Sequence, residues 1–303
     1  MPGYASPVMS SAPPLVSAIV VSYNTRDLLL ETLRSLYHAT EIPFEAIVVD
    51  NGSHDGSAEL IEQQLPQVQV LREPNLGFGR ANNAGLQQAS GRFVLLLNAD
   101  VLLAPGCVDR LADHLLVHPE VGAVGPRLTR PDGRLDLACR RGFPTPRASF
   151  YRMSGLSRLF PHSRRFNRYN LGYLPEDQTH DIDAGTAACL LVRRSAIDQV
   201  GFFDPDFFMY GEDLDLCYRL KEGGWRIVYH PAAQAVHLKG QSTQQATERM
   251  LFAFHSAMWT FHVKHYASDL SAFLNGVIWA SIWGRWAVLR TRAAVTHDPR
   301  VSV

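Results

Sequence analysis

The chain has 303 residues, enough for one large α/β domain or two small ones. Hydrophobic residues make up 46% of it and charged residues 19%, which is typical of a globular protein and excludes a disordered chain. Because 29 basic residues balance 29 acidic ones, the overall positive field of a dedicated nucleic-acid-binding protein is absent, and we expect no nucleic-acid partner.

The cysteines and the two terminal segments indicate the cellular compartment of the protein. The four cysteines are far apart and form no Cys-x-x-Cys pair, so we expect reduced thiols in a cytoplasmic protein and no zinc knuckle. Residues 1–14 are rich in Pro and Ser and lack the regions of a signal peptide, which predicts a flexible tail. The apolar stretch at 270–284 is shorter than the roughly 20 residues that a membrane-spanning helix needs.

The first 125 residues alternate between short apolar runs and stretches with helical spacing. The apolar runs predict buried strands at residues 16–21, 46–49, 68–71, 93–97 and 121–124. This alternation predicts an α/β fold with a mostly parallel sheet flanked by helices, in which ligands bind beyond the carboxyl ends of the strands.

Polar residues follow three of these strands. Ser22, Tyr23 and Asn24 follow the first strand, Asp50, Asn51 and Gly52 the second, and Asn98, Ala99 and Asp100 the fourth. Because the carboxyl ends of parallel strands meet at one edge, we expect these groups to lie together.

The segment from residue 137 to 175 contains eight arginines and no acidic residue. Such a run is either a solvated surface loop or a cationic flap over an anionic substrate or lipid headgroup, because guanidinium groups match phosphate oxygens. The sequence leaves both interpretations open.

The second half returns to regular structure. A buried strand is predicted at 187–192, followed by a short helix and by an aromatic run at 207–210. Glu212 and Asp213 then begin a helix that ends at Gly223. We expect a strand at 226–229, a turn at Pro231, a short strand ending at His237, and helices at 249–266 and 270–290.

The motifs resemble those of a known family. Residues 20–24, 48–53, 75–79 and 98–100, read as VVSYN, VVDNGS, NLGFG and NAD, resemble the nucleotide-sugar half of family 2 glycosyltransferases with the GT-A fold. Gly211-Glu212-Asp213 and His237 are similar to the acceptor half. The resemblance covers roughly residues 16 to 265 and is closest to bacterial rhamnosyltransferase-like members. It implies a GT-A domain at 15–265, divided into a nucleotide-sugar-binding half at 15–125 and an acceptor-binding half at 126–265, with a helical tail at 266–303.

The resemblance also implies roles for individual residues. The nucleotide-sugar contacts would come from Ser22, Tyr23, Asn24, Asp50, Asn51, Gly52, Asn75, Gly79, Asn82 and Asn98. Asp100 corresponds to the metal-binding last residue of the DXD motif, and His237 would complete a site for Mg²⁺ or Mn²⁺. Here Asn98 replaces the first Asp of that motif, which removes one negative charge.

Glu212 and Asp213 are the candidate catalytic carboxylates. By resemblance Asp213 is the base that deprotonates the acceptor and Glu212 an acceptor-binding neighbour, although the two roles can be exchanged. Carboxylates also favour a helix N-terminus for purely structural reasons. The aromatic run at 207–210 favours the catalytic interpretation, because apolar side chains around a carboxylate raise its pKa.

The resemblance, together with these residues, implies an inverting, metal-dependent glycosyltransferase of cell-surface polysaccharide synthesis. It would move a hexose or deoxyhexose, with rhamnose from dTDP-rhamnose one candidate, to a hydroxyl of a glycan or lipid-linked acceptor. Two alternatives stay open: a nucleotidyltransferase, and a noncatalytic nucleotide-sugar or glycan-binding partner, which only Asn98 favours.

The tryptophans at 279, 283 and 286 suit either a peripheral helix at the inner face of the cell membrane or a packing helix. The oligomeric state is not encoded in these motifs.

Overall fold

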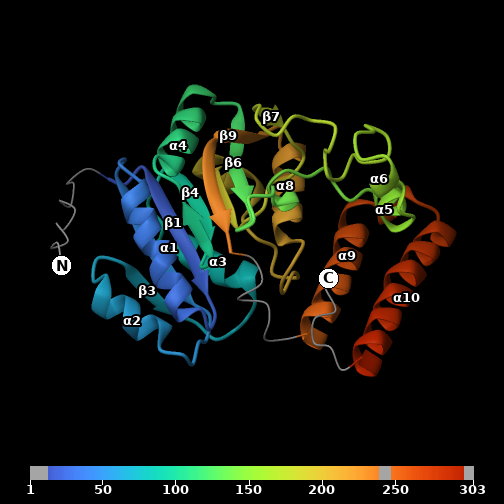
Figure 1. The fold of residues 1–303 in the computed structure, drawn as a ribbon, viewed down its shortest axis with the longest axis horizontal. Coiled ribbons are helices and arrows are strands. Elements are labelled where there is room, and N and C mark those ends of the chain that lie inside the picture. Colours follow the sequence, from blue (N-terminus) through green and yellow to red (C-terminus); the bar gives the residue numbers. More distant parts are fainter. Residues whose placement is uncertain (1–12, 239–246, 297–303) are drawn as a thin grey trace.

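The structure is a computed structural model that describes residues 13–238 and 247–296 (Figure 1). The predictions for residues 1–12 and 297–303 lie outside this part. Within it, nine strands form one sheet: β1 (Val16–Ser22), β2 (Phe44–Asp50), β3 (Gln69–Arg72), β4 (Phe93–Asn98), β5 (Val101–Leu103), β6 (Val121–Thr129), β7 (His180–Asp181), β8 (Cys189–Arg193) and β9 (Arg226–His237).

The first half of the sheet is the predicted parallel unit. Strands β3, β2, β1 and β4 lie side by side and all run parallel. The helices between them are α1 (Arg26–Ala39), α2 (Ser57–Gln64) and α3 (Phe78–Gln88). Helix α3 lies close against the sheet because Gly85 has no side chain: a Cβ there would stand 2.6 Å from Ile19. The five strands predicted in the first 125 residues are confirmed as β1, β2, β3, β4 and β6, although β6 lies in the second half of the sheet.

The second half of the sheet is mixed. Strand β8 pairs antiparallel with β4 and β6, and β9 pairs parallel with β6 and antiparallel with β5 and β7. The predicted turn at Pro231 is wrong, because β9 is one continuous strand. Its register with β6 jumps from His230 to Gln234, and this irregularity accommodates a proline that has no N–H to donate. Strand β5, only three residues long, was not predicted.

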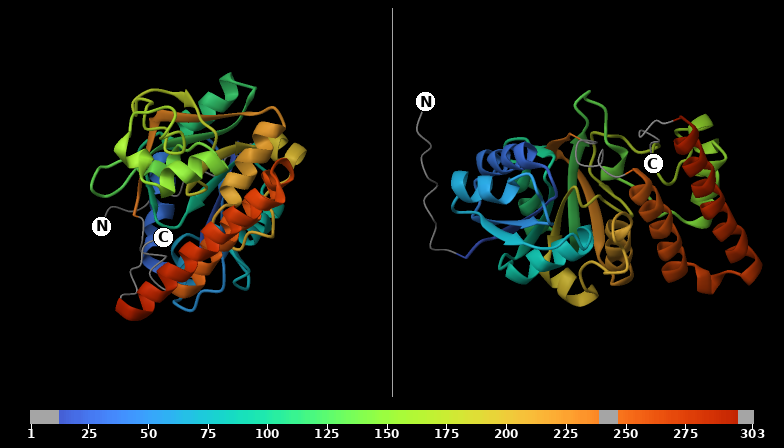
Figure 2. Two further views of the ribbon diagram at one scale, coloured as in Figure 1. Left: turned by 90° about the vertical axis from the view of Figure 1, so that its right-hand side faces the viewer. Right: turned by 90° about the horizontal axis from the view of Figure 1, so that it is seen from below.

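The remaining helices pack around the sheet and to one side of it. They are α4 (Cys107–Val117), α5 (Pro146–Met153), α6 (Leu156–Leu159), α7 (Arg194–Val200), α8 (Glu212–Glu222), α9 (Thr247–His265) and α10 (Ala272–Thr296). Figures 1 and 2 show α9 and α10 as a hairpin on the side of the sheet away from α1 and α2, with α5 and α6 near one end of it. The ring of Phe252 on α9 packs against Trp283 and Trp286 on α10. The predicted division at residue 125 falls inside β6 and stays a prediction.

Candidate active site

The parallel strands bring three of the predicted side chains to one edge of the sheet. Ser22 is in register with Asp50 on β2, and Val21 beside it is in register with Asn98 on β4. Ser22 and Asp50 are buried, whereas Tyr23 is 38% exposed. The expected cluster of polar strand ends is therefore confirmed as a structural arrangement.

Loop hydrogen bonds shape a cradle beside this edge. The side-chain oxygen of Asn24 accepts from the backbone N–H of His54 at 2.8 Å, and the backbone N–H of Asn24 donates to Ser53 Oγ at 2.9 Å. Asn51 donates a longer bond of 3.4 Å to Asn75. Gly52 has φ +84°, and a Cβ there would stand 3.2 Å from the backbone nitrogen of Asn75, so the tight turn requires glycine.

Two amides at this edge keep unused hydrogen-bonding capacity. Within the described residues, Oδ1 of Asn51 and Oδ1 of Asn98 are buried and have no hydrogen-bond partner. Buried polar atoms are rarely left unpaired in folded proteins, and the exceptions concentrate at functional sites. Both amides belong to the predicted nucleotide-sugar set.

Gly79 and Asn82 contact the protein itself. Asn82 donates to the carbonyl of Phe78 at 3.0 Å, and a Cβ on Gly79 would stand 3.3 Å from Phe203. The N–H of Phe78 donates to the carbonyl of Phe208 at 2.9 Å. The NLGFG motif therefore packs against the loop of residues 201–211. The nucleotide contacts predicted for Gly79 and Asn82 stay a prediction.

Strand β5 brings Asp100 to His237. Val101 pairs with His237 across the β5–β9 ladder, which places the preceding Asp100 within 3.3 Å of His237, measured from Oδ1 to Nε2. On its other side His237 Nδ1 lies 2.9 Å from Oδ2 of Asp136. Burial by itself would lower the pKa of His237, but the hydrogen bonds to Asp100 and Asp136 outweigh it and raise this pKa to about 9.

The chemistry of this pair fits a divalent cation. In the described residues no group of three or more His, Cys, Asp or Glu side chains could hold a metal ion. A cation of the Mg²⁺ type, however, needs only one or two protein ligands at about 2.1 Å and takes the rest from phosphates and water. Neighbouring ligands of an octahedral ion then lie about 3 Å apart, close to the 3.3 Å between Asp100 and His237.

Asp213 is held by an arginine. It lies in the first turn of α8, where Nη2 of Arg141 donates to its Oδ2 at 2.6 Å. The same nitrogen donates to the carbonyl of Gly185, and both side chains of the ion pair are only 12% exposed. The ion pair fixes the orientation of the carboxylate.

Glu212, the neighbouring carboxylate, has a different environment. It is buried, and its Oε2 has no hydrogen-bond partner among the described residues. Burial and the adjacent charge of Asp213 raise the pKa of Glu212 to about 8. The approach to both carboxylates is strained, since Tyr210 has φ +70° immediately before Gly211.

The segment just before β8 contacts both the strand ends and the ion pair of Asp213. The N–H of Asn98 donates to the carbonyl of Ala188, and the nearby carbonyl of Gly185 accepts from Arg141. The segment just before β8 therefore contacts both the end of β4 and the arginine that holds Asp213. The segment of residues 185–188 thus links the end of β4 to the ion pair of Arg141 and Asp213.

Comparison with known proteins decides the family. A family model described as "Glycosyl transferase family 2" matches residues 17–201. The chain is also 34% identical over 259 residues to the N-acetylglucosaminyl-diphospho-decaprenol L-rhamnosyltransferase of Mycobacterium tuberculosis, covering 82% of this chain and 83% of that protein. The chain belongs to glycosyl transferase family 2. The resemblance found in the sequence motifs is confirmed.

Other relatives of this glycosyltransferase are more distant. The O-antigen biosynthesis protein RfbC of Myxococcus xanthus is 30% identical over 76% of this chain, which corresponds to 18% of that protein. Among solved structures, the mannosyltransferase PcManGT of Pyrobaculum calidifontis, in complex with GDP-Man and Mn²⁺, superposes with a TM-score of 0.58 and 17% identity. The superposition covers 94% of this chain and 76% of the PcManGT chain. This likeness confirms the predicted GT-A fold.

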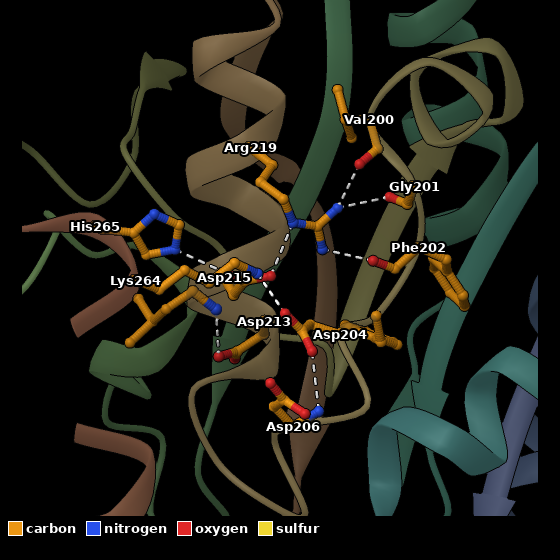
Figure 3. Close-up of polar contacts among 12 residues, drawn as sticks. Val200, Gly201, Phe202, Asp204, Asp206, Asp213, Asp215, Arg219, Lys264 and His265 are labelled. Carbon is orange, nitrogen blue, oxygen red and sulfur yellow. Dashed lines mark hydrogen bonds and ion pairs between the residues drawn. The ribbon is translucent and has the colours of Figure 1, made fainter. Parts of the chain in front are cut away.

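A buried network connects α8 of the glycosyltransferase to α9 (Figure 3). Asp215 is fully buried and accepts from Arg219 on α8 and from Lys264 and His265 on α9, with distances of 2.7 to 2.8 Å. Burial would raise the pKa of Asp215, but these partners lower it to about 2. Arg219 also donates to the carbonyls of residues 200, 201 and 202, so one cluster holds α8, α9 and the start of the 201–211 loop.

The arginine-rich segment of the glycosyltransferase has two structural parts. Arg140 and Arg141 are largely buried and pair with Glu176 and Asp213. The other six, Arg147, Arg152, Arg158, Arg164, Arg165 and Arg168, form no ion pair with a carboxylate in the described part of the chain, and four of them lie over aromatic rings. The segment is therefore folded around its arginines, and the solvated-loop interpretation is wrong for Arg140 and Arg141.

The helical hairpin exposes apolar side chains. On α10, Phe273 is 78% exposed and Trp279 is 50% exposed. Phe150 on the neighbouring helix α5 is also exposed, at 61%. No helix within residues 13–238 and 247–296 combines the length and apolar character that crossing a bilayer requires. The tryptophans were predicted either to contact a membrane or to pack within the protein. Trp283 packs on Phe252, whereas Trp279 is half exposed.

Three residues of the site were missed by sequence reasoning: Asp136, Arg141 and Asp215. In the sequence Arg141 is distinguished only as one of the eight arginines of residues 137–175. Asp215 carried a usable signal, because it lies between the apolar residues Leu214 and Leu216 of α8, and a carboxylate buried in such a run needs a cationic partner. Asp136 carried no local signal.

Proposed function

We propose that this protein is an inverting, metal-dependent glycosyltransferase that moves a deoxyhexose or hexose from a nucleoside diphosphate to a hydroxyl of a lipid-linked glycan. Rhamnose is the first candidate for the sugar, because the relative covering 82% of the chain is an L-rhamnosyltransferase acting on a diphospho-decaprenol. We also propose that the product enters cell-surface polysaccharide. The O-antigen biosynthesis relative supports this assignment.

Two carboxylate centres with different partners support this proposal. Asp100 lies beside His237 at the end of β4, and Asp213 lies at the start of α8 with its orientation fixed by Arg141. Glycosyl transfer needs a counter-charge for the leaving diphosphate and a base for the acceptor. Each centre suits one of these two tasks.

In this mechanism Asp213 takes the proton of the acceptor hydroxyl. The hydroxyl oxygen forms a bond to C1 of the sugar from the face opposite the diphosphate. The bond between C1 and the phosphate oxygen breaks, and its electron pair leaves with the nucleoside diphosphate. Attack from the opposite face inverts the configuration at C1. In this mechanism the hydrogen bond from Arg141 orients the Asp213 carboxylate.

The protein holds the donor at the strand edge. We assign the base and ribose to Asp50 and the cradle around Asn24 and Asn51, and the sugar to Asn98, whose amide oxygen has no acceptor role within the described residues. Asp100 and His237 would hold Mg²⁺ or Mn²⁺, which when bound would neutralise charge on the leaving diphosphate. The Mn²⁺ in the PcManGT complex supports a cation of this class.

We further propose peripheral contact with the cytoplasmic face of the cell membrane. A lipid-linked acceptor keeps its lipid in the bilayer, so the enzyme has to work at the surface. The exposed Phe273 and Trp279 of α10 and the arginines on and near α5 provide the apolar and cationic groups that interfacial helices use.

Ligand-induced stabilisation tests the donor and the cation together. UDP-, GDP- and dTDP-sugars are screened by thermal shift with and without Mn²⁺, since a ligand at 100 times its Kd adds about 2.7 kcal/mol of stability. We expect one nucleotide class to stabilise the protein, more strongly with Mn²⁺, and Asp100→Ala to abolish the Mn²⁺ dependence. Equal Mn²⁺ dependence in Asp100→Ala would remove Asp100 from the site, and no response to any nucleotide sugar would contradict the proposed function.

A further inference from the structure

Asp136 forms the outer end of a buried row of three side chains. Asp136, His237 and Asp100 are 1%, 6% and 3% exposed. The Oδ2 of Asp136 lies 2.9 Å from Nδ1 of His237, and Nε2 of the same ring points to Asp100 at 3.3 Å. The imidazole therefore has a carboxylate at each nitrogen, and only one of the two carboxylates is at the strand edge.

Local structure fixes the Asp136 carboxylate. The N–H of Asp136 donates to the carbonyl of Leu128 at 2.9 Å, which ties the residue to the end of β6. Its Oδ1 accepts from the N–H of Ala138 at 3.2 Å and so caps the short 3₁₀ turn Leu137–Cys139. Because one oxygen is used by the turn, the other is held facing His237.

A histidine that binds a cation uses the lone pair of one ring nitrogen and carries its proton on the other. The hydrogen bond made by that second nitrogen decides which tautomer is present and how the ring is oriented. Asp136 occupies the acceptor position for Nδ1–H. With the proton held there, Nε2 is the nitrogen that faces Asp100 and the end of β4.

We propose that Asp136 is the positioning residue of the cation site, holding His237 so that Nε2 and Asp100 together bind the metal ion that accompanies the donor diphosphate. Asp136 acts through His237 and does not itself touch the cation or the substrate. The proposal rests on the proposed function for the presence of that cation. It gives a role to a carboxylate that the family motifs do not include.

The test uses two variants that keep the turn intact and differ in their contact with His237. Asp136→Asn keeps an acceptor oxygen of the same reach without the charge, and Asp136→Ser caps the turn but is too short to reach the ring, since Asn and Ser are both good capping residues. Asp132→Asn is the matched control, because Asp132 is an exposed carboxylate in the preceding turn.

Mn²⁺ binding is measured directly, by electron paramagnetic resonance titration of the full-length protein at saturating dTDP or UDP. We expect Mn²⁺ affinity to fall about 10- to 100-fold in Asp136→Ser, as is typical of lost outer-shell partners. Asp136→Asn should lose less, and Asp132→Asn should match the wild type. Melting temperature and nucleotide affinity in EDTA should stay near wild type in all three, because the proposed role concerns only the metal.

The outcomes separate this inference from the function it rests on. Wild-type Mn²⁺ binding with both Asp136 variants within about twofold of it would overturn the positioning role alone. Parallel losses of melting temperature, metal-free nucleotide affinity and Mn²⁺ affinity would show a structural role only and would also overturn it. If the wild-type protein bound nucleotide but no Mn²⁺, the cation part of the proposed function would fail as well.

Discussion

Arg141 donates a hydrogen bond of 2.6 Å to Asp213 across 72 residues of sequence, and this ion pair fixes the proposed base. The arginine is itself held, because its backbone pairs with Ala184 and its side chain also reaches the carbonyl of Gly185. Orientation of a general base matters as much as its basicity, since proton transfer requires hydrogen-bond contact with the acceptor hydroxyl.

Replacing Arg141 should therefore affect both folding and transfer. Arg141→Met leaves a largely buried carboxylate without its partner and should cost about 3 kcal/mol of unfolding free energy. Arg141→Lys keeps the charge but cannot make the same bonds to Asp213 and Gly185, so we expect a fold near wild-type stability and a transfer rate reduced at least about tenfold. Urea denaturation and transfer assays measure the two effects. Arg134→Met is the control, because its ion pair with Asp132 is exposed and should contribute under about 1 kcal/mol.

Glu212 makes stability depend on pH. Its pKa is raised from 4.5 to about 8 in the folded protein, so between these values the native state keeps a proton that the unfolded chain has released. The unfolding free energy contributed by this group is therefore highest below pH 4.5 and is lost as pH rises towards 8. Urea denaturation at about pH 5.5 and about pH 8 should show Glu212→Gln gaining about 1 kcal/mol or more relative to wild type at the higher pH. A difference between the two proteins that does not change with pH would show that Glu212 is charged in the native state.

The sequence predicted those features that have a local signature. Buried strands, the helix that begins at Glu212 and the polar groups at strand ends follow from periodicity and from family motifs. Strand β5 has only three residues, too few for a periodic signal, yet it places Asp100 next to His237. Pairings such as Asp136 with His237, 101 residues apart, and Asp215 with His265, 50 residues apart, depend on the completed fold. The sequence therefore predicted most of the candidate site groups, whereas their partners depend on the tertiary structure.

Gly77 should be essential for the close packing of the NLGFG motif against the loop of residues 201–211. It has φ +101°, and a Cβ there would approach the carbonyl oxygen of Phe208 to 2.2 Å. Gly133 is a matched control, because it has φ +79° and a Cβ there would meet no other atom within 4 Å among the described residues. Gly133→Ala should cost about 1 kcal/mol from backbone strain alone. In urea denaturation Gly77→Ala should lose at least about 2 kcal/mol more, because a backbone carbonyl has to move, and equal losses would show that the loop does not need this contact.

The exposed face of α10 should bind membranes. Phe273→Ser with Trp279→Ser removes two exposed apolar side chains and should leave the fold intact. We expect cosedimentation with phosphatidylglycerol vesicles to fall severalfold, because interfacial binding scales with buried apolar area. Val117→Ser on α4, where the valine is 72% exposed, is the control for loss of exposed apolar surface elsewhere. Absence of vesicle binding by the wild-type protein, or unchanged binding by the double variant, would contradict the proposed membrane contact.

Asp213 is the proposed base of glycosyl transfer, and single-turnover kinetics of Asp213→Asn tests this role. Donor and acceptor are both saturating, so that the rate reports chemistry, and Glu212→Gln is measured beside it. Asn keeps the size of the side chain but cannot take the proton, and loss of a general base typically lowers the rate about 10²- to 10⁴-fold. We predict a transfer rate reduced by this factor, with nucleotide and Mn²⁺ affinities near wild type and a smaller loss of rate in Glu212→Gln. A near-normal transfer rate in Asp213→Asn would contradict the mechanism.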